Sequence, residues 1–205
     1  MRAATKPMPR PRKFPSPETV VPAPRSDYVE SFSPSVGGNC RVLILGSMPG
    51  VRSLAAEQYY AHPQNLFWPL MQDVFGVARG LPYAQRLAEL NAAGVGLWDV
   101  LQGCERRGSL DSDIAKASEI PNAIPALLAQ QPEIHALAFN GAKALQVFQR
   151  HALRHIPSLR LQQLQLLPLP STSPAHASMS RADKLAQWSV LKALTSSPRS
   201  QARSR

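Results

Sequence analysis

The chain has 205 residues, of which 44% are apolar and 18% charged, which supports one substantial core but is short for two full domains. No apolar run approaches the roughly 18 residues that a membrane-spanning helix needs, and the basic, proline-broken N-terminus lacks the apolar block of a secretory signal. We therefore expect a cytoplasmic, intracellular protein with no membrane segment. Two cysteines, Cys40 and Cys104, are too few for a disulfide framework or a four-cysteine metal site, so we expect no metal and no cofactor.

The formal net charge of +10 is concentrated at the two ends of the chain. Residues 1–26 carry a net +5 and residues 192–205 a net +4, and eight of the twenty prolines fall within the first 38 residues. Such a proline-rich stretch cannot hold regular structure. The composition therefore predicts a disordered basic arm over 1–38, a folded domain over 39–194 and a disordered basic tail over 195–205. Basic arms attract phosphates, although solvated tails without a partner fit the composition equally well.

Between these ends, short β-rich runs alternate with segments of helical spacing. Strands are predicted at 41–45, 94–98, 134–139 and 164–169, and helices at 66–75, 83–93, 124–130, 142–151 and 180–194. The last helix opens with a capping box, in which Ser180 precedes Asp183 by three residues, and its expected buried stripe is Leu185, Trp188 and Leu191. This order predicts an α/β fold of three layers, with a central four-stranded, mostly parallel sheet flanked by helices.

Ligands in folds of this kind bind at the carboxyl ends of the strands, where three unusual segments fall: 46–68, Asn140-Gly141 and 170–177. The first begins with Gly46-Ser-Met-Pro-Gly50, whose glycines let backbone N–H groups approach a ligand. It continues with Tyr59-Tyr-Ala-His-Pro-Gln-Asn-Leu-Phe-Trp68, in which four aromatic residues crowd around one asparagine. A plain turn and a hydrophobic plug under a loop are the structural alternatives for these two strings.

In this order, the two strings resemble motifs of the uracil-DNA glycosylase superfamily. Its mismatch-specific uracil and thymine glycosylases share G-I-N-P-G, then an aromatic residue and A-H-P-x-N-x-F-W. This chain has the similar strings Gly46-Ser-Met-Pro-Gly50 and Tyr60-Ala-His-Pro-Gln-Asn-Leu-Phe-Trp68 in the same order. The superfamily's second motif, a loop that inserts into DNA, resembles Leu169-Pro-Ser-Thr-Ser-Pro-Ala-His-Ala177. With Trp98-Asp99 and Gly108-Ser-Leu-Asp-Ser-Asp-Ile114, the chain is most similar to the hypoxanthine-DNA glycosylases, over roughly residues 40–193.

The resemblance implies a monomeric, monofunctional repair enzyme that flips a deaminated base out of damaged DNA, excises it by hydrolysis and leaves an abasic site. Hypoxanthine is the expected base, and the essential residue is the asparagine of N-x-F-W, Asn65. Met48 replaces a water-positioning asparagine, and a thioether accepts hydrogen bonds too weakly to orient water. Leu169 replaces the His or Asn of the second motif, so uracil excision should be weak. The three segments contain no lysine, which argues against a Schiff-base lyase step.

The resemblance also assigns binding roles around the expected pocket. Four residues are expected to bind the base: Ser47, Met48, Tyr60 and Asn140. Four more are expected to contact DNA: Ser171, Thr172, Ser173 and His176. Tyr60 would stack on the base, the hydroxyls would bond phosphate oxygens, and the segment from Pro174 to His176 would fill the gap in the duplex. A helix-entry turn is the structural alternative for that last loop.

Other polar residues are expected to be structural. Paired carboxylates could perform acid/base work, but Asp99 is expected to cap a turn or brace the pocket, and Asp111 and Asp113 look like parts of a capping segment. His62 is expected to make structural hydrogen bonds.

Three alternatives to hypoxanthine excision remain open at this stage. They are a uracil or thymine mismatch glycosylase, a non-catalytic nucleic-acid-binding module on the same fold, and a small-molecule α/β enzyme that uses the Gly46 loop for phosphate. The last lacks the strings G-x-G-x-x-G and G-x-x-x-x-G-K-[ST].

Overall fold

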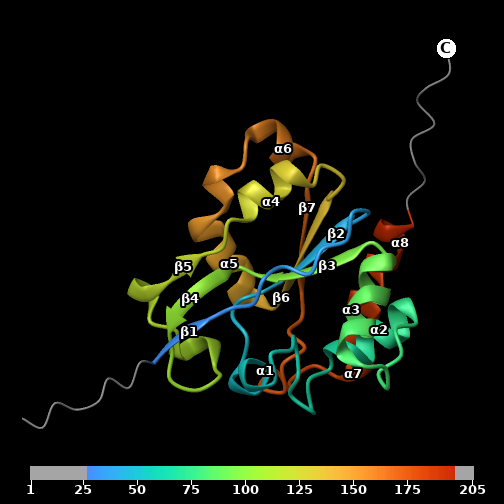
Figure 1. The fold of residues 1–205 in the computed structure, drawn as a ribbon, viewed down its shortest axis with the longest axis horizontal. Coiled ribbons are helices and arrows are strands. Elements are labelled where there is room, and N and C mark those ends of the chain that lie inside the picture. Colours follow the sequence, from blue (N-terminus) through green and yellow to red (C-terminus); the bar gives the residue numbers. More distant parts are fainter. Residues whose placement is uncertain (1–26, 197–205) are drawn as a thin grey trace, which may run out of the picture.

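A computed structural model describes residues 27–196, and its centre is a four-stranded parallel sheet (Figure 1). The strands are β2 (Val42–Gly46), β3 (Val95–Asp99), β6 (Ala136–Asn140) and β7 (Gln165–Leu169), in the spatial order β3-β2-β6-β7. All neighbouring pairs are parallel. The predicted sheet is confirmed, with strand ends displaced by no more than two residues.

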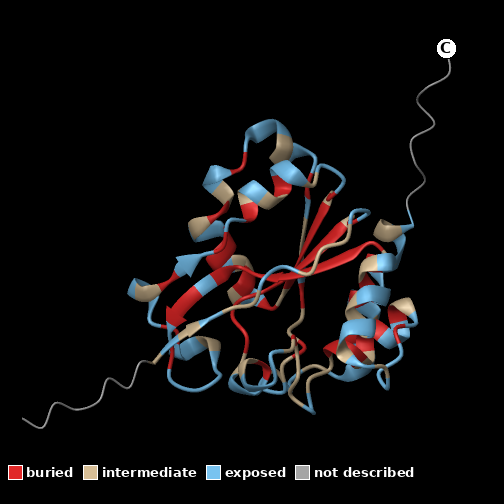
Figure 2. Ribbon diagram, in the orientation of Figure 1, coloured by how far each residue is buried: buried red, intermediate tan, exposed pale blue. Residues whose placement is uncertain are grey.

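Helices cover both faces of this sheet, which gives the predicted three layers (Figure 1). One side carries α4 (Ile124–Gln130), α5 (Ala142–His151) and α6 (Ser158–Gln162), and the other carries α2 (Phe67–Phe75), α3 (Tyr83–Ala92), α7 (Arg181–Trp188) and α8 (Val190–Thr195). Each face of the sheet has its own hydrophobic core, and alternate residues of β2 point into the two cores. Leu43 and Leu45 pack toward α4 and α5, whereas Val42 and Ile44 pack toward α2 and α3. Strands β2 and β3 are buried along their whole length and β6 up to Asn140, as expected for parallel strands covered by helices, whereas β7 at the edge of the sheet is buried only at Leu169 (Figure 2).

A second, smaller sheet was not predicted. It pairs β1 (Tyr28–Glu30), β4 (Leu101–Glu105) and β5 (Ile120–Pro121) in antiparallel order β1-β4-β5. The expectation of irregular structure up to Gly38 is therefore wrong for residues 28–30, because backbone pairing with β4 orders them despite the nearby prolines. Val29, Phe32 and Val36 also pack against the two cores. Residues 1–26 of the predicted arm and 197–205 of the predicted tail lie outside the described residues.

Short helical segments complete the chain. These are α1 (Val51–Ala56), η1 (Asp111–Asp113), η2 (Lys116–Ser118) and η3 (Leu153–His155). No helix among residues 27–196 is long and apolar enough to span a membrane.

The last predicted helix is divided in two at Ser189. Its capping box is confirmed, since the Asp183 N–H donates to Ser180 Oγ at 3.1 Å. The Ser189 hydroxyl donates to the Leu185 carbonyl four residues earlier, at 2.7 Å, a bond that bends helices. Trp188 and Leu191 are fully buried as expected, and Leu185 is half-buried.

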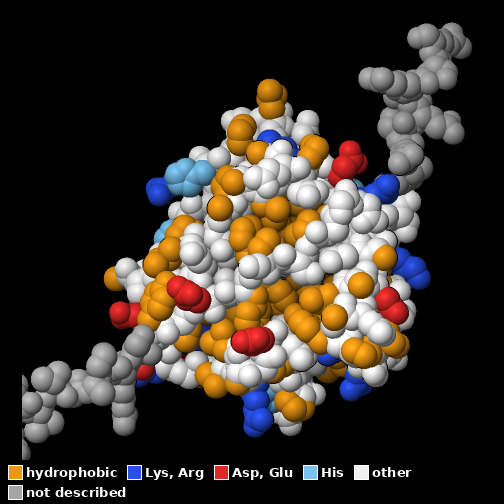
Figure 3. All heavy atoms as spheres, in the orientation of Figure 1, with side chains coloured by type: hydrophobic (Ala, Val, Ile, Leu, Met, Phe, Trp, Pro, Cys, Tyr) orange, Lys and Arg blue, Asp and Glu red, His pale blue; other side chains and the backbone are white. Residues whose placement is uncertain are grey.

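Charge on the described part of the chain is nearly balanced. Residues 27–196 carry a net +2, so most of the excess positive charge lies in the residues outside them. Figure 3 shows one face, on which hydrophobic side chains gather near the middle and Lys and Arg lie singly around the edge. That face presents no broad basic patch.

Candidate active site

A cavity of about 280 Å³ opens at the carboxyl ends of the parallel strands. Its volume lies near the lower end of the range for pockets that enclose a small molecule. All three segments singled out in the sequence meet there, although their contact in space could not be read from the chain order. The lining comprises Gly46–Gly50, Arg52, Ser53, Tyr59, Tyr60, His62, Asn65, Asp99, Ser109–Asp111, Asn140 and Ser171–His176.

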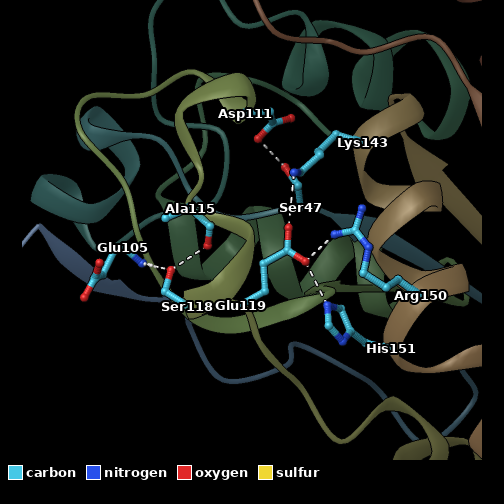
Figure 4. Close-up of polar contacts among 9 residues, drawn as sticks. All are labelled: Ser47, Glu105, Asp111, Ala115, Ser118, Glu119, Lys143, Arg150 and His151. Atoms are coloured by element: carbon cyan, nitrogen blue, oxygen red, sulfur yellow. Dashed lines mark hydrogen bonds and ion pairs between the residues drawn. The ribbon is translucent and has the colours of Figure 1, made fainter.

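The Gly46 loop forms one wall of the cavity. A Cβ on Gly46 would clash with Asp99 Oδ1 and touch the Tyr60 hydroxyl, so glycine is required for these groups to meet. The Ser47 hydroxyl donates to Asp111 Oδ1 at 2.6 Å (Figure 4). Met48 lines the cavity but is only 7% exposed and packs in the core. Ser47 and Met48 are thus at the pocket, with the Ser47 hydroxyl already committed to a carboxylate.

Tyr60 lines the cavity, and one face of its ring is covered. That face stacks on Phe67, with ring centroids 3.9 Å apart and planes at 21°, and the φ of 57° places Tyr60 in the left-handed region. A non-glycine residue rarely adopts that region without a reason. Burial, followed by the nearby Asp99 carboxyl, raises the pKa of Tyr60, so the phenol stays neutral.

The two polar atoms of the Asn65 amide have different surroundings. Its Oδ1 accepts from the N–H of Phe67, the first residue of α2, at 2.9 Å. Its Nδ2 makes no hydrogen bond to any described residue, and the side chain lines the cavity. Toward a ligand, Asn65 is therefore a hydrogen-bond donor. His62 accepts from the Gln64 N–H at 3.2 Å, in keeping with the structural role expected for it.

Asn140 holds the loop after β7 in place. Its Nδ2 donates to Thr172 Oγ1 and its Oδ1 accepts from the Thr172 N–H, both at 2.9 Å. Thr172 is 0% exposed, so the expectation that its hydroxyl contacts phosphate is wrong: that hydroxyl is buried against Asn140. The side chains of Ser171 and Ser173 remain partly exposed at the rim, beside the exposed Pro174 and Ala175.

Helix α7 supports the same loop from behind. The Trp188 indole N–H donates to the Pro170 carbonyl at 3.0 Å, and Lys184 Nζ donates to the His176 carbonyl at 2.7 Å. Lys184 is 1% exposed, and sequence reasoning missed it because a lysine on an amphipathic helix is normally solvated. The backbone of His176 is therefore fixed, while its half-buried ring lines the cavity.

Two carboxyl groups that were expected to be structural line the cavity. Asp99 is 3% exposed, and its buried Oδ2 has no hydrogen-bond partner among the described residues. Burial, together with the charge of Asp111, raises the pKa of Asp99 to about 8, although Arg106 acts in the opposite direction. Burial also raises the pKa of Asp111, against the Ser47 hydrogen bond and the charges of Arg106 and Lys143. The sequence signals for this pair were the position of Asp99 at a strand's carboxyl end and the place of both aspartates in segments that resemble the hypoxanthine-DNA glycosylases.

Lys143, whose charge acts on Asp111, is already engaged. Lys143 lies behind the cavity near Asp111, where its Nζ bonds Glu119 Oε1 at 3.2 Å (Figure 4). It does not line the cavity. Among residues 27–196, no cluster of three or more His, Cys, Asp or Glu could hold a metal ion.

The fold and the site define a three-layer α/β domain whose cavity lies between a glycine loop, an aromatic-asparagine loop and a serine loop. Residues 34–195 match the family model described as "Uracil DNA glycosylase superfamily". The chain belongs to this superfamily.

Three similar proteins come from Methanosarcina. A hypoxanthine DNA glycosylase of Methanosarcina barkeri is 38% identical over 116 residues, which cover 56% of this chain and 72% of the relative. One of Methanosarcina acetivorans is 32% identical over 154 residues, 75% of this chain and 90% of the relative. The solution NMR structure of a candidate uracil DNA glycosylase from Methanosarcina acetivorans has a TM-score of 0.68 and 30% identity, covering 82% of this chain and 98% of that one.

Proposed function

We propose that this protein is a DNA-deoxyinosine glycosylase: it flips deoxyinosine out of DNA and hydrolyses the bond between hypoxanthine and the sugar. The observation that carries the proposal is the donor amide of Asn65 in a cavity where Met48 replaces a water-orienting group, in a chain similar to two hypoxanthine DNA glycosylases. The product is an abasic site, and no lysine lines the cavity to form a Schiff base.

Base flipping explains why the cavity is small and partly aromatic. A base inside a duplex cannot reach a buried pocket, so the nucleotide rotates out of the stack, at less cost when deamination has weakened its pairing. The face of Tyr60 that Phe67 does not cover then stacks on the base, an interaction worth about 1–3 kcal/mol. Phe67 fixes the ring of Tyr60 from behind, so the stacking surface is already in place.

Asn65 acts on the leaving base. As the glycosidic bond breaks, negative charge develops on the purine, and a fixed donor aimed at that charge lowers the barrier. Because its Oδ1 is held by the Phe67 N–H, the amide needs little reorganisation to present Nδ2. Ser171, Ser173 and His176, at the rim of the cavity, contact the flanking DNA backbone.

We propose that the enzyme acts as a monomer. Its DNA substrate places its action inside the cell.

The test is single-turnover cleavage of labelled duplexes that contain one deoxyinosine, xanthine or uracil, followed by alkali. Asn65→Asp is the informative variant, because the carboxylate still accepts from the Phe67 N–H while the donor is lost. Asn39→Ala, an exposed asparagine bonded to the Ala92 carbonyl, is the control. We expect hypoxanthine release by wild type and Asn39→Ala, and a loss of about 100-fold or more in Asn65→Asp.

Two other results would assign a different function to the protein. Stronger release of uracil than of hypoxanthine would make this a uracil glycosylase. Binding of the duplexes without release of any base by folded wild-type protein would make it a binding module and would overturn the proposal.

A further inference from the structure

We propose that Asp99 is a second catalytic residue, which donates a proton to the departing base. The inference rests on the proposed glycosylase function and concerns the same cavity. It assigns the acid of the reaction to a residue on β3, outside the motif loops.

The geometry of Asp99 sets it apart from a structural carboxylate. It ends β3 at the floor of the cavity, and the absence of a Cβ on Gly46 leaves room for its Oδ1. Its Oδ2 is buried without any protein donor. A buried ionised carboxylate is stable only when donors or cations compensate it, so this environment favours the protonated, neutral form.

Charge balance around the cavity supports the same assignment. The titratable groups that interact electrostatically with Asp99 are Tyr59, Tyr60, Tyr83, Arg106 and Asp111. Arg52, His62 and His176 line the same cavity. The three phenols are neutral, so the one cation that acts on both carboxyls is Arg106, while Lys143 acts on Asp111. Arg106 itself is 3% exposed and donates to the Pro49 carbonyl at 2.5 Å, not to either aspartate.

Asp111 takes the negative charge of the pair. It accepts a 2.6 Å hydrogen bond from Ser47, and the cation of Lys143 lies nearby. Asp99 has neither, so the proton stays on Asp99. Two adjacent carboxyls in unlike environments can in this way divide into an acid and a base.

The proposed step balances without any co-reactant except water. The C1′–N9 bond breaks and its electron pair passes to the purine, while the Asp99 carboxyl transfers its proton to a ring nitrogen. Water adds its oxygen to C1′, and the proton that this water loses returns to Asp99. The products are neutral hypoxanthine and an abasic sugar with a hydroxyl at C1′.

The test is the pH dependence of single-turnover hypoxanthine release between pH 5.5 and 10. Four proteins are compared: wild type, Asp99→Asn, Asp111→Asn and Asp113→Asn. Asp113 is the matched control, because it is an exposed aspartate in the same segment as Asp111. Circular dichroism and thermal unfolding establish that each variant is folded.

Wild type and Asp113→Asn should lose activity above a break near pH 8. Asp99→Asn, isosteric but unable to transfer a proton, should be slower by about 100-fold or more at pH 7 and should lack this break. Ionisation of the base itself would leave a break in Asp99→Asn as well, so the variant separates the two causes. Asp111→Asn removes the neighbouring charge and should move the break to lower pH.

A folded Asp99→Asn with the wild-type rate, or a slower one that keeps the alkaline break, overturns the inference. If Asp99→Asn fails to fold, Asp111→Asn decides: a break at unchanged pH overturns the inference, and a break at lower pH supports it. Wild-type protein that releases no base at any pH refutes the proposed function itself and this step with it.

Discussion

Asp99 and Glu119 are both buried carboxyl groups, yet their surroundings are opposite. Glu119, whose side chain is 0% exposed, receives Lys143, Arg150 and His151 at 3.2, 2.5 and 2.8 Å (Figure 4). Among residues 27–196, Asp99 has no hydrogen-bonded cation, and its Oδ2 has no hydrogen-bond partner. The two sites teach that burial alone does not decide what a carboxyl does: Glu119 is compensated and joins elements together, whereas Asp99 is left to hold a proton beside a cavity.

The pKa values move in opposite directions for this reason. Burial by itself would raise the pKa of Glu119, but hydrogen bonds from His151, Arg150 and Lys143 outweigh it and lower that pKa below its ordinary value. For Asp99, burial and the charge of Asp111 act together, and the pKa rises to about 8.

The largest expected effect comes from removing the compensated carboxyl. Glu119→Ala leaves Lys143, Arg150 and His151 around an empty site and should lower the free energy of unfolding by about 3 kcal/mol. This is the lower end of the cost of breaking a buried pair, because the cations keep some contact with solvent. Urea denaturation measures it, with the exposed Glu105→Ala as the control. Equal stability of the two variants would mean that the Glu119 cluster does not hold β5 to α5.

Stability should also depend on pH with opposite slopes at the two sites. The stability that Glu119 contributes is present above its ordinary pKa of 4.5 and is lost as the pH falls through its lower folded value. Protonated Asp99 contributes stability that is full below its ordinary pKa of 3.8 and is lost as the pH rises toward its folded pKa of about 8.

Two isosteric variants, each compared with wild type, show how the free energy of unfolding changes with pH at the two sites. The deficit of Glu119→Gln should be present at pH 7 and shrink as the pH falls below about 4.5, whereas Asp99→Asn should gain stability relative to wild type between pH 4 and pH 8. Denaturation at four or five pH values measures both. Parallel slopes would remove the contrast between the sites.

Variants of Tyr60 test whether the base binds in the cavity that Asp99 lines. Tyr60→Ala removes the stacking face and should slow hypoxanthine release by about 10-fold or more, whereas Tyr60→Phe keeps the ring and should stay close to wild type. Single-turnover release measures both variants. A loss of thermal stability in Tyr60→Ala that accounts for the whole effect would return Tyr60 to a packing role against Phe67.

The smallest expected effect tests the donor that distinguishes Asp111 from Asp99. Ser47→Ala removes the 2.6 Å hydrogen bond to Asp111, so the pKa of Asp111 rises and its charge is partly lost. The alkaline break assigned to Asp99 should then move to lower pH, by less than in Asp111→Asn. A break that stays in place would mean that Ser47 does not control the charge of the pair.

Much of the fold was predictable because buried parallel strands appear in the sequence as continuous apolar runs. Val42–Gly46 and Ala136–Asn140 are of this kind and were placed to within two residues. The smaller sheet was not predictable, because β5 has two residues and β1 three, too few for a period to be detected. Their pairing with β4 depends on contacts between distant parts of the chain.

The candidate site also has features that the sequence could predict and features that it could not. The loops that carry Ser47, Tyr60 and Asn65 could be placed at strand ends, and they do line one cavity. The burial of Thr172 and the role of Asp99 could not be foreseen, since each depends on whether a partner arrives from elsewhere. Asp111, 64 residues from Ser47, receives a donor, and Asp99 does not.

The difference between the two buried carboxyls is tested most directly by NMR titration of protein with ¹³C-labelled aspartate and glutamate carboxyls, assigned with Asp99→Asn and Glu119→Gln. The account predicts an Asp99 carboxyl that stays protonated at pH 7 and titrates near pH 8, and a Glu119 carboxyl that is ionised and titrates below pH 4.5. An Asp99 carboxyl that is already ionised at pH 5 would contradict it.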